Sequence, residues 1–211
     1  MKEESKPVNE EGTASAKLEA LLEQSAALHR HLCPRQVLGV RMGLLGGASL
    51  QIEVPQQQRK RLFVYMETDG CAADGVSVAT GCWVGRRTMR LMDFGKVAAT
   101  FVDRTSQTAL RIRPRNGVRQ MAEKHSEDQA SRWHSMLSAY QTMSVSELFV
   151  VERVSLLDDL EGWISRPSSR VICQNCGEEI INQRQMEVEK ELLCRACAGE
   201  AYYVINPGKD R

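Results

Sequence analysis

Four cysteines near the C-terminus have the spacing of a structural metal site. They form two pairs, Cys173 with Cys176 and Cys194 with Cys197, separated by seventeen residues. Each CxxC pair places two sulfurs on one tight turn, and two such pairs supply the four thiolates that surround a tetrahedral zinc ion. Because four thiolates leave no open coordination position, the spacing predicts a structural zinc finger rather than a catalytic centre. A redox dithiol or a disulfide pair is the alternative interpretation.

Soft and titratable side chains also gather in two segments of the N-terminal half. These side chains are His29, His31, Cys33, Cys71 and Cys82. Cys33 and Cys71 each precede a predicted helix, where free N–H groups and the helix dipole favour a thiolate. Thiolates bind metals and attack electrophiles, and a neutral imidazole would complete a mixed nitrogen and sulfur site suited to zinc, iron or copper.

Three interpretations of these five residues stay open. They are the ligands of a core metal site, with Asp69 and Asp74 orienting an imidazole. Alternatively, Cys33 or Cys71 is the nucleophile of an enzyme, and a histidine such as His31 carries the proton. In the third interpretation the cysteines simply fill the core, since free cysteines are among the most buried residues.

The composition indicates a soluble, cytoplasmic protein. The 211 residues contain 42% hydrophobic and 26% charged residues, with a net charge of +1, which suits one medium domain and a small one. No apolar run approaches the length of a membrane span, and the first residues lack a signal-peptide pattern. Cysteine pairs that read as metal ligands are typical of a reducing compartment.

The small net charge hides an uneven distribution. Residues 84–119 contain eight arginines and one lysine but only two aspartates, a net charge of +7, whereas residues 171–205 have a net charge of −3. Arg111 and Arg113 alternate on one face of a predicted strand, where they either hold an anion or form a solvated face. Aromatic residues make up only 5% of the chain and do not interleave with the arginines, so a nucleic-acid surface is not favoured.

The order of the predicted elements favours an α+β fold, with helices packed on an antiparallel sheet, and the cysteine pairs add a small four-cysteine zinc finger at the C-terminus. The expected organisation is a mobile tail (1–13), a core domain (14–155), a linker (156–170) and the finger (171–205). Helices are expected at 14–31, from Pro34 to Gly46-Gly47, at 72–80 and, as one long helix, at 116–140. Strands are expected at 61–67, 88–92, 96–102, 108–113 and 149–151, with the second and third joined as a hairpin at 93–95.

Three ordered segments resemble the FmdE-like family, which takes its name from a component of formylmethanofuran dehydrogenase. The first is His29-Arg30-His31-Leu32-Cys33-Pro34-Arg35, followed by Gly39-Val40-Arg41-Met42-Gly43. The second is Thr68-Asp69-Gly70-Cys71 with Thr80-Gly81-Cys82, and the third is Asp93-Phe94-Gly95-Lys96-Val97-Ala98. The resemblance spans about residues 18–154, and many members also end in a CxxC…CxxC finger.

This resemblance implies an α+β core domain, a treble-clef-like zinc finger at the C-terminus, a pocket lined by the five His and Cys residues and a tendency to form homodimers. The chain departs from the family pattern at Arg30 and Arg35, where glycines are usual, and at Arg86-Arg87, which replace Lys-Gly. We expect Arg86 and Arg87 to contact an anionic ligand. The leading hypothesis is a metal-binding protein with structural zinc and a second transition metal in the core, accessory to a molybdenum or tungsten oxidoreductase. The alternatives are a cysteine-dependent enzyme and a zinc-finger adaptor for protein or nucleic acid.

Overall fold

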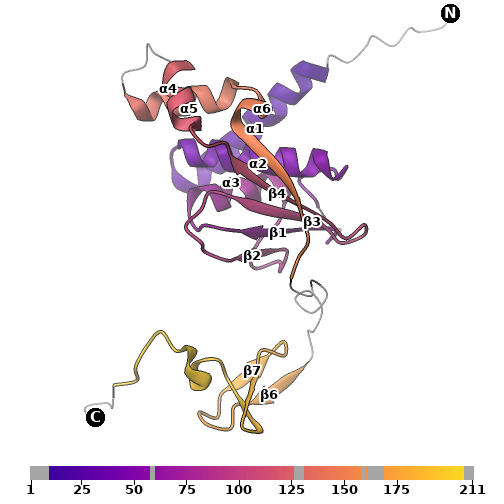
Figure 1. Ribbon diagram of the computed structural model, residues 1–211, viewed down its shortest axis with the longest axis vertical. Coiled ribbons are helices and arrows are strands. Elements are labelled where there is room, and N and C mark those ends of the chain that lie inside the picture. Colours follow the sequence, from indigo (N-terminus) through magenta and orange to yellow (C-terminus); the bar gives the residue numbers. More distant parts are fainter. Residues whose placement is uncertain (1–9, 58–59, 126–130, 158–159, 161–168, 207–211) are drawn as a thin grey trace, which may run out of the picture. The chain divides into compact units, whose positions relative to one another are not determined.

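The computed structural model describes residues 10–57, 60–125, 131–157, 160 and 169–206. The chain divides into two compact units, Met1–Leu157 and Asp158–Arg211. The larger unit contains the helices α1 (Glu10–His29), α2 (Pro34–Ser49), α3 (Cys71–Thr80), α4 (Val118–His125), α5 (Arg132–Thr142) and α6 (Val145–Leu148). Its strands are β1 (Leu62–Met66), β2 (Met89–Leu91), β3 (Ala99–Asp103), β4 (Thr108–Pro114) and β5 (Phe149–Val154), as Figure 1 shows. The fold is therefore α+β, as predicted.

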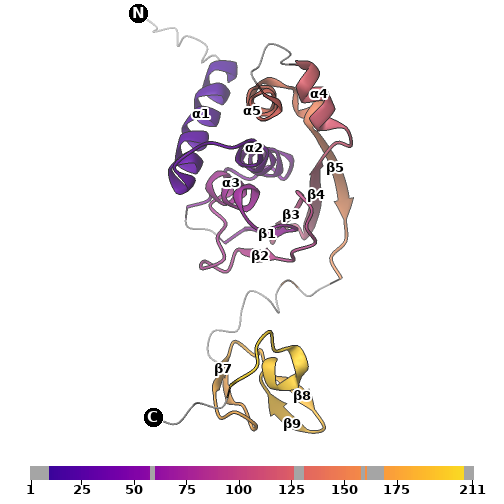
Figure 2. The same ribbon diagram turned by 90° about the vertical axis from the view of Figure 1, so that its left-hand side faces the viewer.

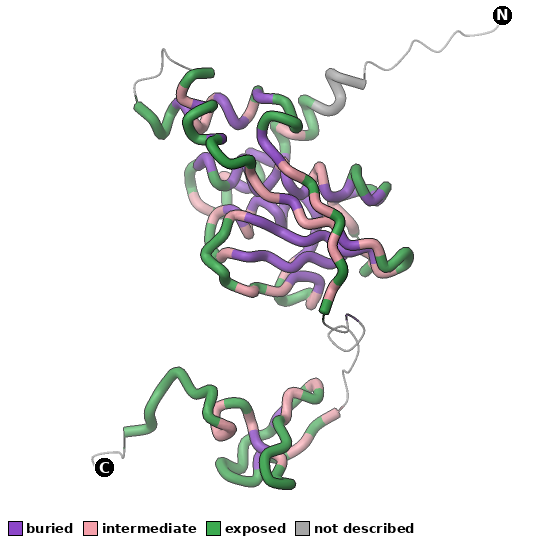
Figure 3. The backbone as a smooth tube through the Cα atoms, viewed as in Figure 1, coloured by how far each residue is buried: buried purple, intermediate pink, exposed green. Residues whose placement is uncertain are grey.

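The five strands form one sheet in the order β2-β1-β3-β4-β5. All pairs are antiparallel except β1 with β2, which is parallel. The sheet curls around α2 and α3, and α1 lies beyond them (Figure 2). The central strands β1 and β3 are buried along their whole length, and Figure 3 shows that α2 and α3 are also largely buried.

Small residues allow α2 and α3 to pack unusually closely. These two helices share the most extensive contact between any two elements of the chain. A Cβ atom added to Gly39 of α2 would fall on the carbonyl oxygen of Ala72 in α3, and one added to Gly75 of α3 would lie 2.5 Å from the carbonyl oxygen of Gln36. Glycine is therefore required on both helices where they cross, because any side chain would meet main-chain atoms.

Several local sequence signals are confirmed. Cys33 is the N-cap of α2, with Pro34 as the first helical residue. Gly81 ends α3 in the left-handed conformation, at φ 71°, which glycine adopts without steric strain. Ser144 and Glu147 form the capping box predicted before β5, in which the Ser144 N–H donates to the Glu147 carboxylate at 2.8 Å.

Three expectations about the elements are wrong. The segment 93–95 is not a hairpin turn, because β1 lies between β2 and β3. That segment instead wraps around the end of β1, where the main-chain N–H groups of Phe94 and Lys96 donate to the carbonyl oxygen of Glu67. The single helix expected at 116–140 is two helices, α4 and α5. Finally, α2 continues past Gly46-Gly47 to Ser49, because both glycines pack against side chains such as Phe101 and Val54.

The smaller unit contains two short hairpins and a helical turn. Strands β6 (Arg170–Ile172) and β7 (Glu179–Ile181) form one antiparallel pair, and β8 (Met186–Val188) and β9 (Glu191–Leu193) form the other. The turn spans Ala196–Glu200. Its buried core is very small and consists of Cys173, Ile180 and Leu193.

Some expectations fall on residues outside the described part. They are most of the tail at 1–13, residues 126–130 of the long helix and most of the linker at 156–170. Within the described residues, no helix has both the length and the apolar character needed to span a bilayer.

Candidate functional site

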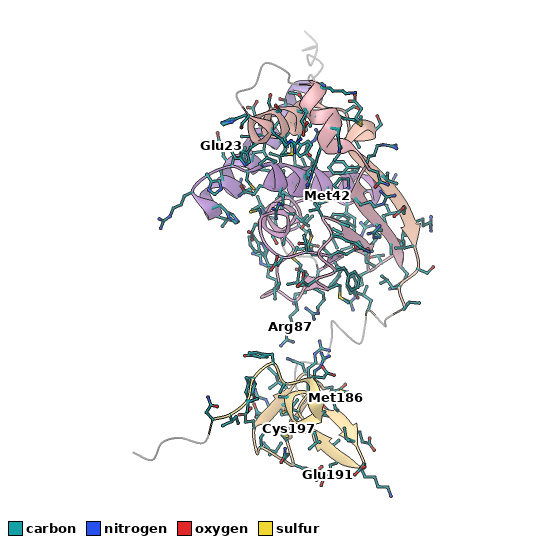
Figure 4. The ribbon with its side chains drawn as sticks, turned by 60° about the vertical axis from the view of Figure 1, so that its left-hand side comes forward. Glu23, Met42, Arg87, Met186, Glu191 and Cys197 are labelled. Atoms are coloured by element: carbon teal, nitrogen blue, oxygen red, sulfur yellow. The ribbon has the colours of Figure 1, made fainter. Side chains whose placement is uncertain are left out.

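The four C-terminal cysteines converge in the smaller unit. The sulfur atoms of Cys173, Cys176, Cys194 and Cys197 all lie within 4.8 Å of one another. The Cys176 and Cys194 sulfurs are 3.9 Å apart, close to the separation of about 3.8 Å that tetrahedral zinc–sulfur bonds require. Figure 4 places Cys197 in this unit beside the β8–β9 hairpin. The cluster therefore fits a metal ion with four thiolate ligands.

Main-chain N–H groups prepare this cluster to hold negative charge. The N–H of Cys194 donates to the Cys173 sulfur at 3.2 Å, and that of Cys197 donates to the Cys194 sulfur at 3.4 Å. Hydrogen bonds from the backbone of Cys176 and Cys194 lower the pKa of the Cys173 thiol to about 6. The neighbouring Cys194 sulfur raises the pKa of Cys197 to about 12. Full ionisation thus needs a cation among the sulfurs.

Cys33 and Cys71, far apart in the sequence, meet in the larger unit. Cys33 caps α2 and is buried, and Cys71 is the first residue of α3 and is half-buried. Both line a cavity of about 790 Å³, a size typical of small-molecule sites. The close crossing of α2 and α3 brings the starts of these helices, and hence the two thiols, together.

A buried glutamine fixes the turn that carries Cys33. The side-chain oxygen of Gln36 accepts a hydrogen bond from the Cys33 N–H at 2.8 Å, and its amide nitrogen donates to the Ser25 carbonyl oxygen at 2.7 Å. Gln36 is fully buried, so it connects the start of α2 to α1 in a place without competing water.

The environment of Cys71 does not favour the thiolate that its helix position predicts. Burial raises the pKa of the Cys71 thiol, the adjacent Cys33 thiol raises it further, and Arg35 acts weakly in the opposite direction. Burial therefore outweighs the helix N-terminus here. Without a ligand, the Cys71 thiol is protonated at neutral pH.

The two histidines lie near the start of α3 but have separate roles in the structure. The Nε2 atom of His29 is 2.5 Å from a carboxylate oxygen of Asp74, one turn along α3 from Cys71. His31 is exposed, and its Nδ1 atom is 2.9 Å from the carbonyl oxygen of His29. Asp69 is exposed at the turn before α3. Of the two aspartates, Asp74 therefore orients an imidazole and Asp69 does not.

Cys82 does not line the cavity. Its side chain is fully buried just after the end of α3, where the sulfur donates to the Leu62 carbonyl oxygen at 3.3 Å and receives a hydrogen bond from the side-chain amide of Gln56 at 3.2 Å. Burial raises the pKa of this thiol to about 11. Within the described residues, the C-terminal cysteine cluster is the only group of three or more metal-ligating side chains whose ligand atoms lie within 4.8 Å of one another. The five core residues thus do not form a closed metal cage.

Arg86 and Arg87 also lie away from the cavity. They follow α3 in a turn, and Figure 4 shows Arg87 projecting from the larger unit. The sequence indicates Arg111 and Arg113 as an anion-binding candidate, and both line the cavity, together with Arg115 and Arg119 of the same arginine-rich stretch. The cavity wall also includes Trp133 and Tyr140 of α5. Arg41 of α2 holds the C-terminal end of α5, because it donates at 2.7 Å to the carbonyl oxygens of Tyr140 and Met143.

Comparison with known proteins identifies relatives of this chain. Residues 28–150 match the family described as "FmdE, Molybdenum formylmethanofuran dehydrogenase operon". The "Probable S-adenosyl-L-methionine-binding protein" of Archaeoglobus fulgidus is 29% identical over 221 residues, which cover 94% of this chain and 58% of that protein. This chain therefore spans less than two thirds of that curated relative.

A solved structure shares the fold. The crystal structure of a tungsten formylmethanofuran dehydrogenase FmdE-like protein from Syntrophus aciditrophicus matches with a TM-score of 0.56 at 18% identity, covering 89% of this chain and 95% of that one. The family match includes the starts of both α2 and α3, where Cys33 and Cys71 meet. On the strength of that match over more than half of its length, this chain belongs to the FmdE family.

Proposed function

We propose that this FmdE-family chain is a metal-binding accessory protein with two metal sites. The four C-terminal thiolates hold a structural zinc ion. Cys33 and Cys71 bind a second, thiophilic metal in the cavity of the larger unit. The observation that carries this proposal is the meeting of the Cys33 and Cys71 thiols, from two different helices, at one cavity.

A metal explains this thiol pair better than a catalytic nucleophile does. A nucleophilic cysteine needs a lowered pKa, whereas burial and the neighbouring thiol raise the pKa of Cys71. A thiophilic metal displaces the protons of both thiols, and two adjacent thiolates can then bind the same ion. Two sulfurs leave coordination positions for another ligand. His29 is an imidazole candidate, because it is held by Asp74, one turn along α3 from Cys71.

Metal analysis of the full chain, purified without oxygen, tests this proposal. We expect zinc and a second metal in the wild type, loss of only the second metal in Cys33→Ser/Cys71→Ser, and loss of zinc in Cys176→Ser. Cys82→Ser is the matched control, because Cys82 is a core thiol outside the cavity. A single zinc ion per chain that is unchanged in the double variant would refute the second site.

The names of the family and of its solved member support a role beside a molybdenum or tungsten oxidoreductase. In this proposal the chain acts in the cytoplasm as a homodimer and docks on that enzyme. Light scattering of the purified chain, alone and mixed with such an enzyme, measures both associations. A monomer that does not associate with the enzyme would contradict this part of the proposal.

S-adenosylmethionine, named for the Archaeoglobus relative, is not favoured as the ligand of this cavity. The aligned part covers only 58% of that protein, so its named ligand need not bind the shared part. S-adenosylmethionine carries a sulfonium, an ammonium and one carboxylate, a net positive charge, whereas the Arg, Lys, Asp and Glu residues in the described part of the cavity wall are all arginine or lysine. Like charges in one cavity repel.

A further inference from the structure

The cavity that contains Cys33 and Cys71 is strongly cationic. Its wall includes six positive side chains and, within the described residues, no carboxylate. The six are contributed by α2, the loop after β2, the end of β4 and the start of α4: Arg35, Lys96, Arg111, Arg113, Arg115 and Arg119. Residues distant in the sequence thus concentrate positive charge around one hollow.

Neighbouring carboxylates neutralise only two of these six cations, as far as the described residues show. Arg111 contacts Glu67 at 2.6 Å and Glu152 at 3.0 Å, and Arg113 contacts Glu152 at 3.3 Å. Arg111 and Arg113 of β4 are therefore paired within the fold itself, and their charges need no ligand.

The other four cations have no ion-pair partner in the described part of the chain. Arg115 donates to the carbonyl oxygen of Ser146 at 2.6 Å, which leaves its charge uncompensated. The Lys96 ammonium lies 6.0 Å from the Phe94 ring centroid. The structure assigns no side-chain hydrogen bond to Lys96, Arg35 or Arg119 among the residues described. All four are exposed, so solvent screens their mutual repulsion, and together they form a positive surface on which an anion would be held by unpaired cations.

Other parts of the wall suit a ligand with both an anionic and an apolar part. The start of α4 and the two residues before it lie in the wall, from Asn116 to Gln120, and the first N–H groups of a helix have no partner within that helix. The apolar side chains of Leu38, Val97 and Tyr140 also line the cavity. A volume of about 790 Å³ is far larger than one inorganic anion needs.

We propose that this cavity binds a small organic molecule that carries a phosphate or diphosphate group. Lys96, Arg115 and Arg119 hold the anion, and the organic part lies on the apolar wall towards Cys33 and Cys71. This inference deepens the proposed function, since it rests on the same cavity and names the class of ligand that accompanies the metal there. Arg86 and Arg87 take no part.

Titration calorimetry of the full chain at low salt tests this assignment, with inorganic pyrophosphate, ADP and S-adenosylmethionine as probes. The rim variant is Lys96→Gln/Arg119→Gln, because neither side chain has a hydrogen bond to the described part of the protein. The control variant is Lys124→Gln/Arg153→Gln, which removes the same charge at two positions outside the cavity wall.

We expect pyrophosphate to bind the wild type and the control, and at least about tenfold more weakly to the rim variant, because charge-assisted contacts are lost. ADP should bind more tightly than pyrophosphate, and S-adenosylmethionine should not compete. Absence of binding to the wild type, or an equal loss in the control variant, would overturn the anion site. Equal affinity for ADP and pyrophosphate would overturn the organic ligand.

The thiol variant separates this inference from the proposed metal site. Cys33→Ser/Cys71→Ser should lose the second metal and still bind pyrophosphate within about threefold of the wild type, since the cations remain. Pyrophosphate binding in a wild type without a second metal would leave the anion site in place and refute the metal. A second metal in a wild type that does not bind pyrophosphate would support the metal site and refute the anion site.

Discussion

Replacement of Gly39 by alanine tests whether the close crossing of α2 and α3 supports the site. The added methyl group would fall on the carbonyl oxygen of Ala72 and lie 3.1 Å from the Cα of Gly75. Both are main-chain atoms of a buried helix, so no side chain can rotate away to make room. The two helices must separate, and the starts of both, with Cys33 and Cys71, move with them.

The magnitude follows from two opposing effects. Overpacking of a buried contact costs about 1–3 kcal/mol, and the upper end applies here because the obstacle is backbone. Replacing a helical glycine with alanine recovers about 1 kcal/mol of helix propensity. We therefore expect Gly39→Ala to lower the free energy of unfolding by about 2 kcal/mol.

Urea unfolding followed by circular dichroism measures this change. Gly85→Ala is the matched control, because a Cβ at Gly85 has no atom within 4 Å, and we expect it to leave the stability unchanged within about 0.5 kcal/mol. Faster alkylation of Cys71 in Gly39→Ala would report the displaced helix start. A Gly39→Ala variant as stable as Gly85→Ala would refute the argument that main-chain contact limits the crossing.

Three further predictions concern charges and thiols. Asp103 is almost fully buried and accepts hydrogen bonds from the Arg61 guanidinium at 2.9 and 2.7 Å, which holds the pKa of its carboxyl well below the usual value. Asp103→Asn should therefore lower the free energy of unfolding by about 2 kcal/mol at neutral pH. A depressed carboxyl pKa stabilises the fold fully above the unfolded pKa of about 3.9 and less as the pH falls below it, so urea titrations at falling pH should show a shrinking difference between variant and wild type. A difference that stays constant would contradict the Asp103–Arg61 pairing. Chelation of the proposed zinc ion, or Cys176→Ser, should unfold the smaller unit and spare the larger one, because the apolar core of the smaller unit is too small to fold without a metal. Hydrogen exchange should then show a loss of protection confined to residues after 169. Protection that survives chelation would show that the metal is dispensable. Cys82 should resist iodoacetamide at pH 7.5 until the chain is unfolded, because burial raises its pKa to about 11, and mass spectrometry of the folded protein that finds Cys82 labelled would contradict its position.

Signals carried by neighbouring residues predicted much of the fold correctly. The Cys33-Pro34 helix start, the Gly81 helix end and the Ser144 capping box all depend on contacts within a few residues, and such contacts can be read from a sequence. The prediction of a hairpin at 93–95 was wrong because the pairing of strands depends on contacts across the whole sheet, in which β1 lies between β2 and β3. The turn residues there are satisfied by Glu67 at the end of β1, and nothing near them in the sequence indicates that partner.

The candidate site shows the same division. The CxxC spacing predicted the four-cysteine cluster because each pair lies on one turn. The residue types around Cys33 and Cys71 indicate a site, but periodicity could not show that Cys82, just after the end of α3, directs its sulfur to the carbonyl oxygen of Leu62 in β1. Lys96 comes from a segment separate from Arg115 and Arg119, and only the folded chain brings the three to one wall, so their convergence could not be predicted from the sequence.

Gln36 has a chemical consequence for variation in this chain. Its side chain offers an oxygen to the Cys33 N–H and a nitrogen to the Ser25 carbonyl oxygen at the same time. Glutamate has the same shape but would place a carboxylate oxygen against the carbonyl oxygen of Ser25. Leucine would leave the Cys33 N–H and the Ser25 carbonyl oxygen buried without a hydrogen-bond partner. The position of the Cys33 main chain, and with it of the thiol, thus depends on an amide three residues away, and a substitution that never touches sulfur can still displace it.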